Sequence, residues 1–384
     1  MTATKKNESF QLPRRLQGVQ PTLIRQIFER ALPESINFGL GEPDLPTPQF
    51  IRDEAARVAL HEQNGYTNHA GIPALRELIA ASYPHLDLQP NQVCVTVGSQ
   101  EAMTAAFLAI VDDGDEVLLP NPSFPAYENC VKISGGEPVF YSLPAAKDFA
   151  FDIEEFKSKI TPKTKAAVVI SPSNPTGKIF TQNDLKQISE VLRDTGIYLI
   201  SDEIYKDLYF TPNKPRSASE FYERTIIVDG LSKSLSMTGW RLGWLASSQT
   251  EVVKAAMTLH GFLTVCTSTI SQKAALLGWT AEAEEAKAEA REIYKRRGEF
   301  LIKLLEDEIG LRGTHPEGAF YTMLDVRSIG GDDIAVAEKF LQNRVITVPG
   351  VAFGTEAKGF LRVSFCNPEE RMVEGVRRMK EAIS

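Results

Sequence analysis

The chain has few cysteines, and none of them is arranged as in a metal site or a disulfide framework. Cys94, Cys130, Cys266 and Cys366 are the only four among 384 residues. They form no C-x-x-C pair, and no histidine lies at a zinc-binding spacing from them. This pattern favours a reduced, cytoplasmic protein without a structural metal.

Long apolar runs and an excess of positive charge are also missing. No stretch approaches the ~18 uninterrupted apolar residues of a membrane span, and the opening sequence MTATKKNESFQLPRRLQ lacks the apolar segment of a signal peptide. Lys and Arg total 42 against 50 Asp and Glu, which gives a formal net charge of −8. Such a balance offers no long-range attraction to nucleic acid or an anionic membrane, so neither is an expected partner. A small anionic ligand remains open.

Motifs of several other enzyme classes are absent. No G-x-G-x-x-G follows an expected strand, Gly177-Lys178 lacks the rest of a Walker loop, and the stretch from Gly230 to Ser234 lacks the closing glycine of a nucleophile elbow. Hydride transfer, nucleotide hydrolysis and serine-type hydrolysis are therefore disfavoured.

The composition is that of a globular protein, with 43% hydrophobic and 24% charged residues, and the length suggests about two domains. Short apolar runs rich in Val, Ile and Leu alternate with helical patterns, as expected for strands covered on both faces. The expected strands are 93–97, 116–119, 139–141, 166–170, 198–201, 225–228 and 242–246. This order predicts an α/β fold with a mostly parallel sheet flanked by helices.

A long helical pattern over 281–308, with Gly298 as a candidate interruption, ends this alternation. The candidate strands 320–326, 345–348 and 360–365 then predict a smaller α+β domain. We therefore expect an irregular N-terminal arm over 1–35 that packs with the small domain, a large domain over 36–278 and a small domain over 279–384.

Polar side chains follow three of the expected parallel strands, at the edge where such sheets bind ligands. They are Asn174 after 166–170, Asp202 and Tyr205 after 198–201, and Ser232 and Lys233 after 225–228, with Arg241 eight residues further on. Each has a structural alternative: an Asx turn for Asn174, a helix N-cap for Asp202, a rim tyrosine, a solvated lysine and a stacked arginine. Only a shared active site explains all of them together.

Two further stretches belong with this group. Gly98-Ser99-Gln100 follows an expected strand and precedes a helical run, so its backbone amides would bind phosphate well. Phe124 and Tyr127 would offer an aromatic face for a planar ring, although core packing explains them equally well.

These stretches together resemble the class I and II aminotransferases, which are pyridoxal-phosphate enzymes of fold type I. The resemblance runs in order through nearly the whole chain. The matching blocks are GEPD at 41–44, YTNHAGIPALRE at 66–77, SPSNPTGK at 171–178, SDEIY at 201–205, SKSLSMTGWRLGW at 232–244 and FLRVSF at 360–365.

The resemblance implies a role for each candidate residue. Lys233 would carry the Schiff base to pyridoxal 5′-phosphate, Asp202 would pair with the ring nitrogen, Asn174 and Tyr205 would bind the ring oxygen, and Phe124 would stack on the ring. Ser99, Gln100, Ser232 and Arg241 would hold the phosphate, Arg362 the substrate carboxylate, and Gly41 would lie over the substrate. Tyr66 would reach the phosphate of a neighbouring subunit, so a homodimer is expected.

The chain departs from the family pattern at two positions. Phe124 stands where the aspartate-specific enzymes usually have Trp, and Gln100 stands where several relatives have a small or hydroxyl residue or Lys. No arginine is identifiable as the partner of a second substrate carboxylate. Arg14, Arg15, Arg25 and Arg30 of the N-terminal arm remain candidates beside their interpretation as solvated or structural charges.

The resemblance favours transamination between an amino acid and a 2-oxo acid, with 2-oxoglutarate as the expected acceptor in a ping-pong cycle. A pyridoxal-phosphate-dependent carbon–sulfur β-lyase on the same scaffold is the alternative. A non-catalytic sensor is disfavoured, since every catalytic position is filled.

Overall fold

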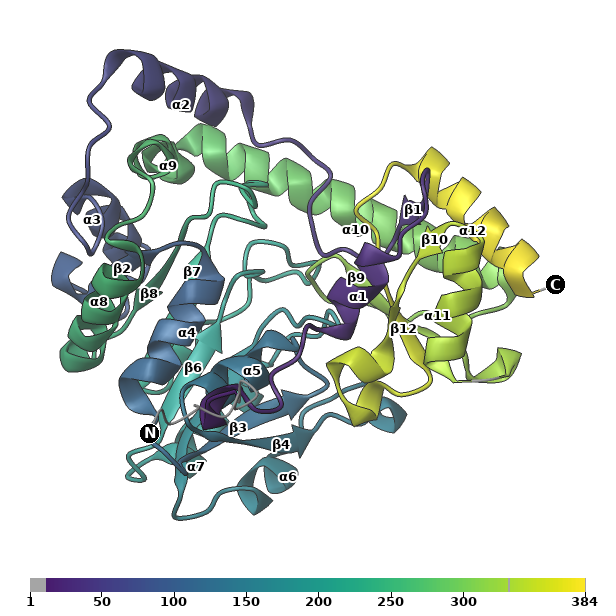
Figure 1. Ribbon diagram of the computed structural model, residues 1–384, viewed down its shortest axis with the longest axis horizontal. Coiled ribbons are helices and arrows are strands. Elements are labelled where there is room, and N and C mark those ends of the chain that lie inside the picture. The colour runs from purple at the N-terminus through teal and green to yellow at the C-terminus, as the bar shows by residue number, and fades with distance from the viewer. Residues whose placement is uncertain (1–11, 331, 384) are drawn as a thin grey trace, which may run out of the picture.

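The structure is a computed structural model that describes residues 12–330 and 332–383. Its elements form two groups: a central sheet with helices on both faces, and a smaller set of C-terminal helices and strands (Figure 1). The expected α/β fold, with a mostly parallel sheet and a smaller α+β part, is confirmed.

The central sheet has the strand order β2-β8-β7-β6-β5-β3-β4. Its strands are β2 (Val93–Thr96), β3 (Glu116–Asn121), β4 (Glu137–Ser142), β5 (Thr164–Ile170), β6 (Tyr198–Asp202), β7 (Thr225–Gly230) and β8 (Gly243–Ala246). β8 runs antiparallel to β2 and β7, and the other neighbours pair in parallel. The boundaries agree with the expected strands to within two residues.

Helices cover both faces of this sheet. One face carries α4 (Ser99–Ile110), α5 (Ala126–Ile133) and α8 (Thr250–Thr264), and the other carries α3 (Pro73–Ala81), α6 (Ile153–Ser158), α7 (Gln182–Leu192) and α9 (Thr269–Ala275). Along β7, Ile226 and Val228 pack toward the first face and Ile227 toward the second, all fully buried. Both faces are therefore apolar, which explains strands without polar alternation.

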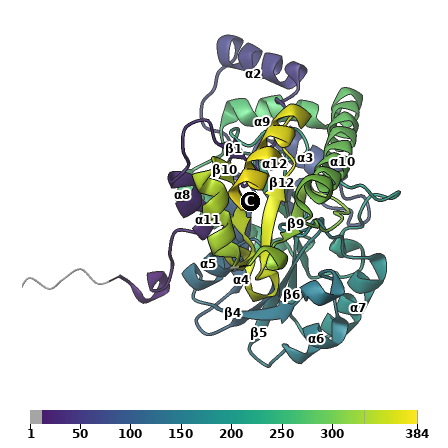
Figure 2. The ribbon, with the colours of Figure 1, turned by 90° about the vertical axis from the view of Figure 1, so that its right-hand side faces the viewer.

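The C-terminal group contains a second, antiparallel sheet. Its order is β11 (Val348–Pro349), β12 (Phe360–Ser364) and β9 (Tyr321–Asp325), accompanied by α11 (Asp333–Gln342) and α12 (Glu369–Ile383). Figure 2 views the molecule from the side of these elements. The long helix α10 (Ala281–Ile309) passes from the central sheet to this group (Figure 1).

Two local expectations differ from the structure. The helix α10 continues through Gly298, where a Cβ atom would lie 3.2 Å from the Phe365 ring, so the glycine permits close packing rather than interrupting the helix. The expected strand 345–348 is divided into β10 (Val345–Ile346) and β11, because β10 pairs with β1 (Ile36–Asn37) while β11 pairs with β12.

The N-terminal arm is not wholly irregular, as the sequence had suggested. It contains α1 (Leu23–Glu29), whose Ile27 packs against Leu341 and Ile346 of the C-terminal group. Two helical turns are too short to show a clear hydrophobic periodicity in the sequence. The helix begins after Thr22, whose side chain acts as an N-cap by accepting a hydrogen bond from the Arg25 amide. The domain limits 1–35, 36–278 and 279–384 stay predictions, and β1 at the start of the second range pairs with β10 of the third.

The segment between β1 and α2 (Gln49–His61) crosses from the C-terminal group to the central sheet. Cys94, Cys130 and Cys366 are buried free thiols, and Cys266 is half-buried. No helix in residues 12–330 and 332–383 has the length and apolarity needed to cross a membrane. The cytoplasmic location stays a prediction.

The substitution Leu245→Ala should lower the free energy of unfolding by about 2–5 kcal/mol, because Leu245 of β8 is fully buried on the sheet face that carries α4 and α8, and truncation leaves a cavity. Urea unfolding measures this change. The control Leu60→Ala, at a side chain of α2 that is 77% exposed, should change it by less than about 0.5 kcal/mol. Equal losses in the two variants would contradict the packing described here.

Candidate active site

A cavity of about 290 Å³ lies at the carboxyl ends of β5, β6 and β7. Eleven of the expected site residues line it: Gly41, Ser99, Gln100, Phe124, Asn174, Asp202, Tyr205, Ser232, Lys233, Arg241 and Arg362. They come from segments far apart in the sequence, including β12 of the C-terminal group. The structure thus gathers one amine, one carboxyl group, two guanidinium groups and two aromatic rings in one place, while the role of each stays a prediction.

Lys233 follows β7 and points its amine into this cavity. Its Nζ atom donates a hydrogen bond to the carbonyl oxygen of Gly41 at 2.6 Å. The pKa of Lys233 is lowered to about 8, mainly by burial; Cys366 and Glu42 oppose this change, and Arg362 and Arg241 contribute to it. A lysine of this kind is partly neutral near physiological pH, so its amine can act as a nucleophile or a base.

Asp202 ends β6 and is buried beside the amine. The Tyr127 hydroxyl donates to its Oδ2 atom at 2.6 Å, and the Ile204 amide donates to Oδ1 at 3.1 Å. Burial nevertheless raises the pKa of Asp202 to about 6. A cation in contact with this carboxyl group would stabilise its ionised form, as a protonated ring nitrogen would do.

Tyr127 was not identified from the sequence as a partner of Asp202. It lies near the start of α5, three residues after Phe124, and the two rings meet edge to face at 5.7 Å. The spacing of three residues at a helix start explains why the two rings lie together. The contact with Asp202 depends on the packing of α5 over the end of β6, which the local sequence does not show.

The first turn of α4 lies beside Arg241. Gly98, with φ of +79°, precedes the helix, and a Cβ atom there would lie 2.5 Å from Nη2 of Arg241. A Cβ atom on Gly243 would lie 2.4 Å from the backbone nitrogen of Ser99, so β8 also approaches this turn closely. No side chain caps the helix start. Its open amides and the adjacent guanidinium suit a phosphate group.

Gln100 contributes its backbone to this turn, while its side chain turns elsewhere. The Nε2 atom of Gln100 contacts Sγ of Cys130 at 3.2 Å. The side chain of Gln100 is therefore engaged by α5, and its role toward a phosphate stays a prediction.

Arg362 reaches the cavity from β12 and is 2% exposed. Its Nη1 atom donates to Oδ1 of Asn174 at 2.8 Å, and its Nη2 atom donates to the carbonyl oxygen of Gly39. Its Nε atom is buried and has no hydrogen-bond partner among the described residues. An arginine with an unused donor fits an incoming carboxylate. Because Asn174 accepts through Oδ1, its Nδ2 atom remains available as a donor.

Tyr321 is a second residue that the sequence did not reveal. It lies at the start of β9, its hydroxyl group meets that of Tyr205 at 2.8 Å, and its ring lies 4.3 Å from the Arg362 guanidinium. Within an expected apolar strand, Tyr321 resembled a core residue, and no local pattern distinguished it.

Tyr66 does not line the cavity. Its side chain is 88% exposed and borders a separate hollow with Cys266 and Thr267. Tyr66 does not reach the cavity of its own chain, so its proposed role depends on a partner subunit.

Of the arm's arginines, Arg15, Arg25 and Arg30 do not line the cavity. Arg25 pairs with Glu29 at 2.8 Å and Arg30 with Glu338 at 2.6 Å, both at the surface. Arg15 borders another hollow, beside Lys132, and the side chain of Arg14 lies outside the described part of the chain. The arm contributes Ile24 to the cavity instead.

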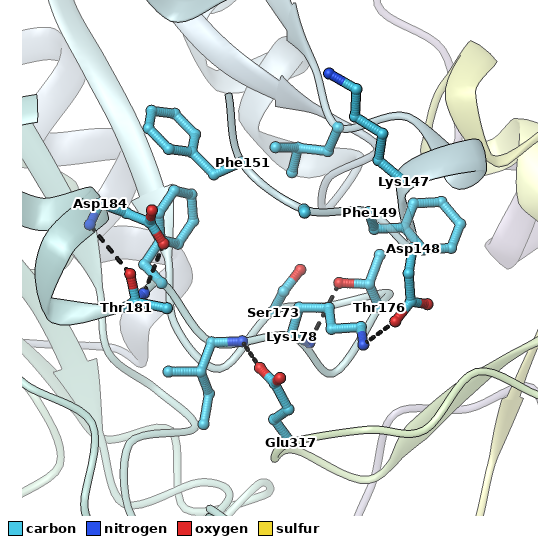
Figure 3. A pocket seen from close by; sticks show the side chains of 14 residues that line it. Lys147, Asp148, Phe149, Phe151, Ser173, Thr176, Lys178, Thr181, Asp184 and Glu317 are labelled. Carbon is cyan, nitrogen blue, oxygen red and sulfur yellow. Dashed lines mark hydrogen bonds and ion pairs between the residues drawn. The ribbon is translucent and has the colours of Figure 1, made fainter. Parts of the chain in front are cut away.

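The loop that carries Asn174 is anchored on its far side, where a second cavity of about 320 Å³ lies (Figure 3). There Lys178 forms an ion pair with Asp148, and the Ile179 amide donates to Glu317 at 2.9 Å. These contacts tie the loop to neighbouring segments and fix the position from which Asn174 reaches Arg362.

Comparison with known proteins gives consistent matches over almost the whole chain. The profile of the family described as "Aminotransferase class I and II" matches residues 33–379. A probable aspartate/prephenate aminotransferase of Aquifex aeolicus is 37% identical over 91% of this chain and 91% of its own length. An aromatic-amino-acid aminotransferase of Thermococcus litoralis is 32% identical over 96% and 97%. The solved aspartate aminotransferase of Thermus thermophilus with maleate has a TM-score of 0.92 at 34% identity, covering 97% of this chain and 100% of that chain.

The lowered pKa of Lys233 predicts the pH dependence of its reactivity. In the cofactor-free protein, reductive methylation of Lys233 with formaldehyde should rise with pH around a midpoint near 8, because only the neutral amine reacts. Peptide mass spectrometry measures the label on this residue, and Lys233→Ala identifies its peptide. A midpoint near the ordinary value of 10.5 would contradict the desolvated environment.

Proposed function

The chain belongs to the class I and II aminotransferases, which use pyridoxal 5′-phosphate, and we propose that it exchanges an amino group between an amino acid and 2-oxoglutarate in a ping-pong cycle. The observation that carries this proposal is the cavity itself. A buried amine of lowered pKa, a buried carboxyl group, an anion site at a helix start and an arginine with an unused donor face one space.

The residues around the cavity suit the parts of the cofactor. Lys233 would hold it covalently, Asp202 would face the ring nitrogen, Asn174 and Tyr205 the ring oxygen, and Phe124 one face of the ring. The amides of Ser99 and Gln100, with Ser232 and Arg241, would bind the phosphate. When bound, the cofactor supplies an electron-accepting ring that stabilises the charge left when a proton departs from the substrate Cα.

Asp202 and Tyr127 act together in this arrangement. An ionised Asp202 keeps a facing ring nitrogen protonated, and the Tyr127 hydroxyl holds the carboxyl group in place by donating to Oδ2. The buried position makes this charge pair stronger than it would be in water.

Lys233 moves the proton. Once its amine is free, Nζ would accept the proton that leaves the substrate Cα and would hold it for return to the reacting group. The carbonyl oxygen of Gly41 accepts a hydrogen bond from Nζ and therefore limits where the free amine can lie.

Arg362 orients the substrate. Its unused Nε donor and its stacking on Tyr321 suit the α-carboxylate, which would place Cα between this arginine and Lys233. Gly41 leaves room for this geometry, because a Cβ atom there would lie 1.9 Å from the Tyr321 hydroxyl oxygen. The names of the relatives include aspartate, prephenate and aromatic amino acids, so the donor is left to experiment.

We propose further that the active unit is a homodimer in which Tyr66 reaches the partner's phosphate site. Apolar side chains stand exposed at the end of α8, near the hollow that Tyr66 borders: Phe262 is 90% exposed, Leu263 58% and Val265 44%. A second copy of the chain would cover this surface.

Adding one amino acid to the cofactor-loaded protein tests the proposed reaction. With an accepted donor, the absorbance of the aldehyde form should be lost, the pyridoxamine form should accumulate and one equivalent of 2-oxo acid should appear. 2-Oxoglutarate should then restore the original spectrum. A screen of the common amino acids, read spectroscopically, identifies the donor.

Release of ammonia and pyruvate from a cysteine-type substrate, without accumulation of pyridoxamine from any donor, would contradict transamination and favour the carbon–sulfur β-lyase. Glutamate formed from 2-oxoglutarate in equal amount to the new 2-oxo acid serves as the internal control.

The substitution Phe262→Lys should weaken the dimer, because it puts a charge into the apolar surface. Light scattering over a range of protein concentrations measures the mass. The control Val373→Lys, at a side chain of α12 that is 48% exposed, should leave the mass unchanged. A monomeric native protein that transaminates at full rate would contradict the proposed dimer.

A further inference from the structure

The segment from Phe38 to Pro48 contains no helix or strand, yet it supplies two backbone contacts to the active site. The Gly39 carbonyl accepts from Arg362, and the Gly41 carbonyl accepts from Lys233. One short segment therefore touches both the cation that would bind the substrate carboxylate and the amine that would move the proton.

The Phe38 end of this segment is held by backbone hydrogen bonds. Its amide donates to the Ile346 carbonyl at 2.9 Å, and its carbonyl accepts from the Ser364 amide at 2.7 Å.

Side chains hold the remainder of the segment beside the cavity. Glu42 accepts from the Thr238 hydroxyl at 2.7 Å, and the Thr47 hydroxyl donates to the Ser236 carbonyl at 2.7 Å. Both contacts lead to the loop that follows Lys233. A third contact leads elsewhere, to α10.

This third contact is an ion pair between Asp44 and Arg297. Nη1 of Arg297 donates to both carboxylate oxygens of Asp44, at 2.8 Å and 3.0 Å, and the Tyr294 hydroxyl approaches the same carboxylate at 3.3 Å. The Arg297 side chain is 10% exposed and that of Asp44 23%. An ion pair shielded in this way is screened by salt much less than one at the surface.

The same part of α10 also supports the opposite wall of the cavity. The Tyr294 ring packs against Phe320 at 5.5 Å, and Phe320 precedes Tyr321, whose hydroxyl group lies against Gly41. The helix α10 therefore fixes the distance between Gly41, which it holds through Asp44, and Tyr321, which it holds through Phe320.

Building on the transaminase function proposed above, we propose that Asp44 and Arg297 are positioning residues. Their ion pair anchors the Phe38–Pro48 segment to α10, so that the carbonyl groups of Gly39 and Gly41 face Arg362 and Lys233. Neither residue touches the substrate or the cofactor. Both act through the backbone of the segment.

The anchor should affect substrate binding and proton transfer more than cofactor retention, because the residues proposed to hold the phosphate lie on α4 and on the loops around Ser232 and Arg241. Asp44→Asn and Arg297→Lys should each raise KM for the amino donor by about tenfold and lower kcat, since small displacements of oriented groups cost this much or more. The dissociation constant for pyridoxal phosphate should change by less than about twofold.

A second measurement needs no activity. In the cofactor-free protein, hydrogen–deuterium exchange of the amides between Phe38 and Pro48 should be at least about tenfold faster in Asp44→Asn and Arg297→Lys than in the native chain. The double variant should exchange no faster than the faster of the two single variants, because either single substitution already breaks the ion pair.

A neighbouring ion pair, which joins α10 to α12, supplies a matched control. Arg296 and Glu369 meet at 3.1 Å, but their side chains are 68% and 39% exposed. Arg296→Lys and Glu369→Gln should therefore leave KM, kcat and exchange of the segment unchanged.

Unchanged exchange in the Asp44 and Arg297 variants would overturn the proposal. So would a rise in KM accompanied by comparable losses of kcat, cofactor affinity and melting temperature, because that pattern indicates a general loss of stability. If instead the native protein converted no amino acid, the proposed function would fail, while the exchange measurement would still report on the anchor.

Discussion

The Lys233 amine is shielded from much of the solvent between the end of β7 and the carbonyl oxygen of Gly41, and the chemistry of the site depends on this confinement. Desolvation disfavours the ammonium form, and Arg241 and Arg362 act in the same direction. An exposed lysine would be a charged surface residue. At this position it becomes a group that can bond to a carbonyl carbon or carry a proton.

The fold places every other element of the site relative to that amine. Parallel strands β5, β6 and β7 end at one edge, which brings Asn174, Asp202 and Lys233 together. The antiparallel strand β8 then returns the chain, so that Arg241 meets Gly98 at the start of α4. Arg362 arrives from β12 of the C-terminal group. A protein of net charge −8 thus concentrates cationic groups around a space suited to a phosphate and a carboxylate.

The sequence was informative wherever function follows from local order along the chain. Strands buried on both faces appear as apolar runs, and the residues after them must lie at the ligand-binding edge, so the ends of β5, β6 and β7 were predictable. Tyr127 and Tyr321 were not, because their partners Asp202 and Tyr205 are distant in sequence. Helix α1 has only two turns and gains its stability from packing on Leu341 and Ile346, which no local pattern reveals.

The proposed transamination depends most directly on the covalent role of Lys233. Reduction of the cofactor-loaded protein with borohydride, followed by digestion and peptide mass mapping, tests it. The predicted result is one pyridoxyl group per chain, attached to Nζ of Lys233. A pyridoxyl group on any other lysine, or a cofactor that washes away unreduced after tight binding, would contradict the account.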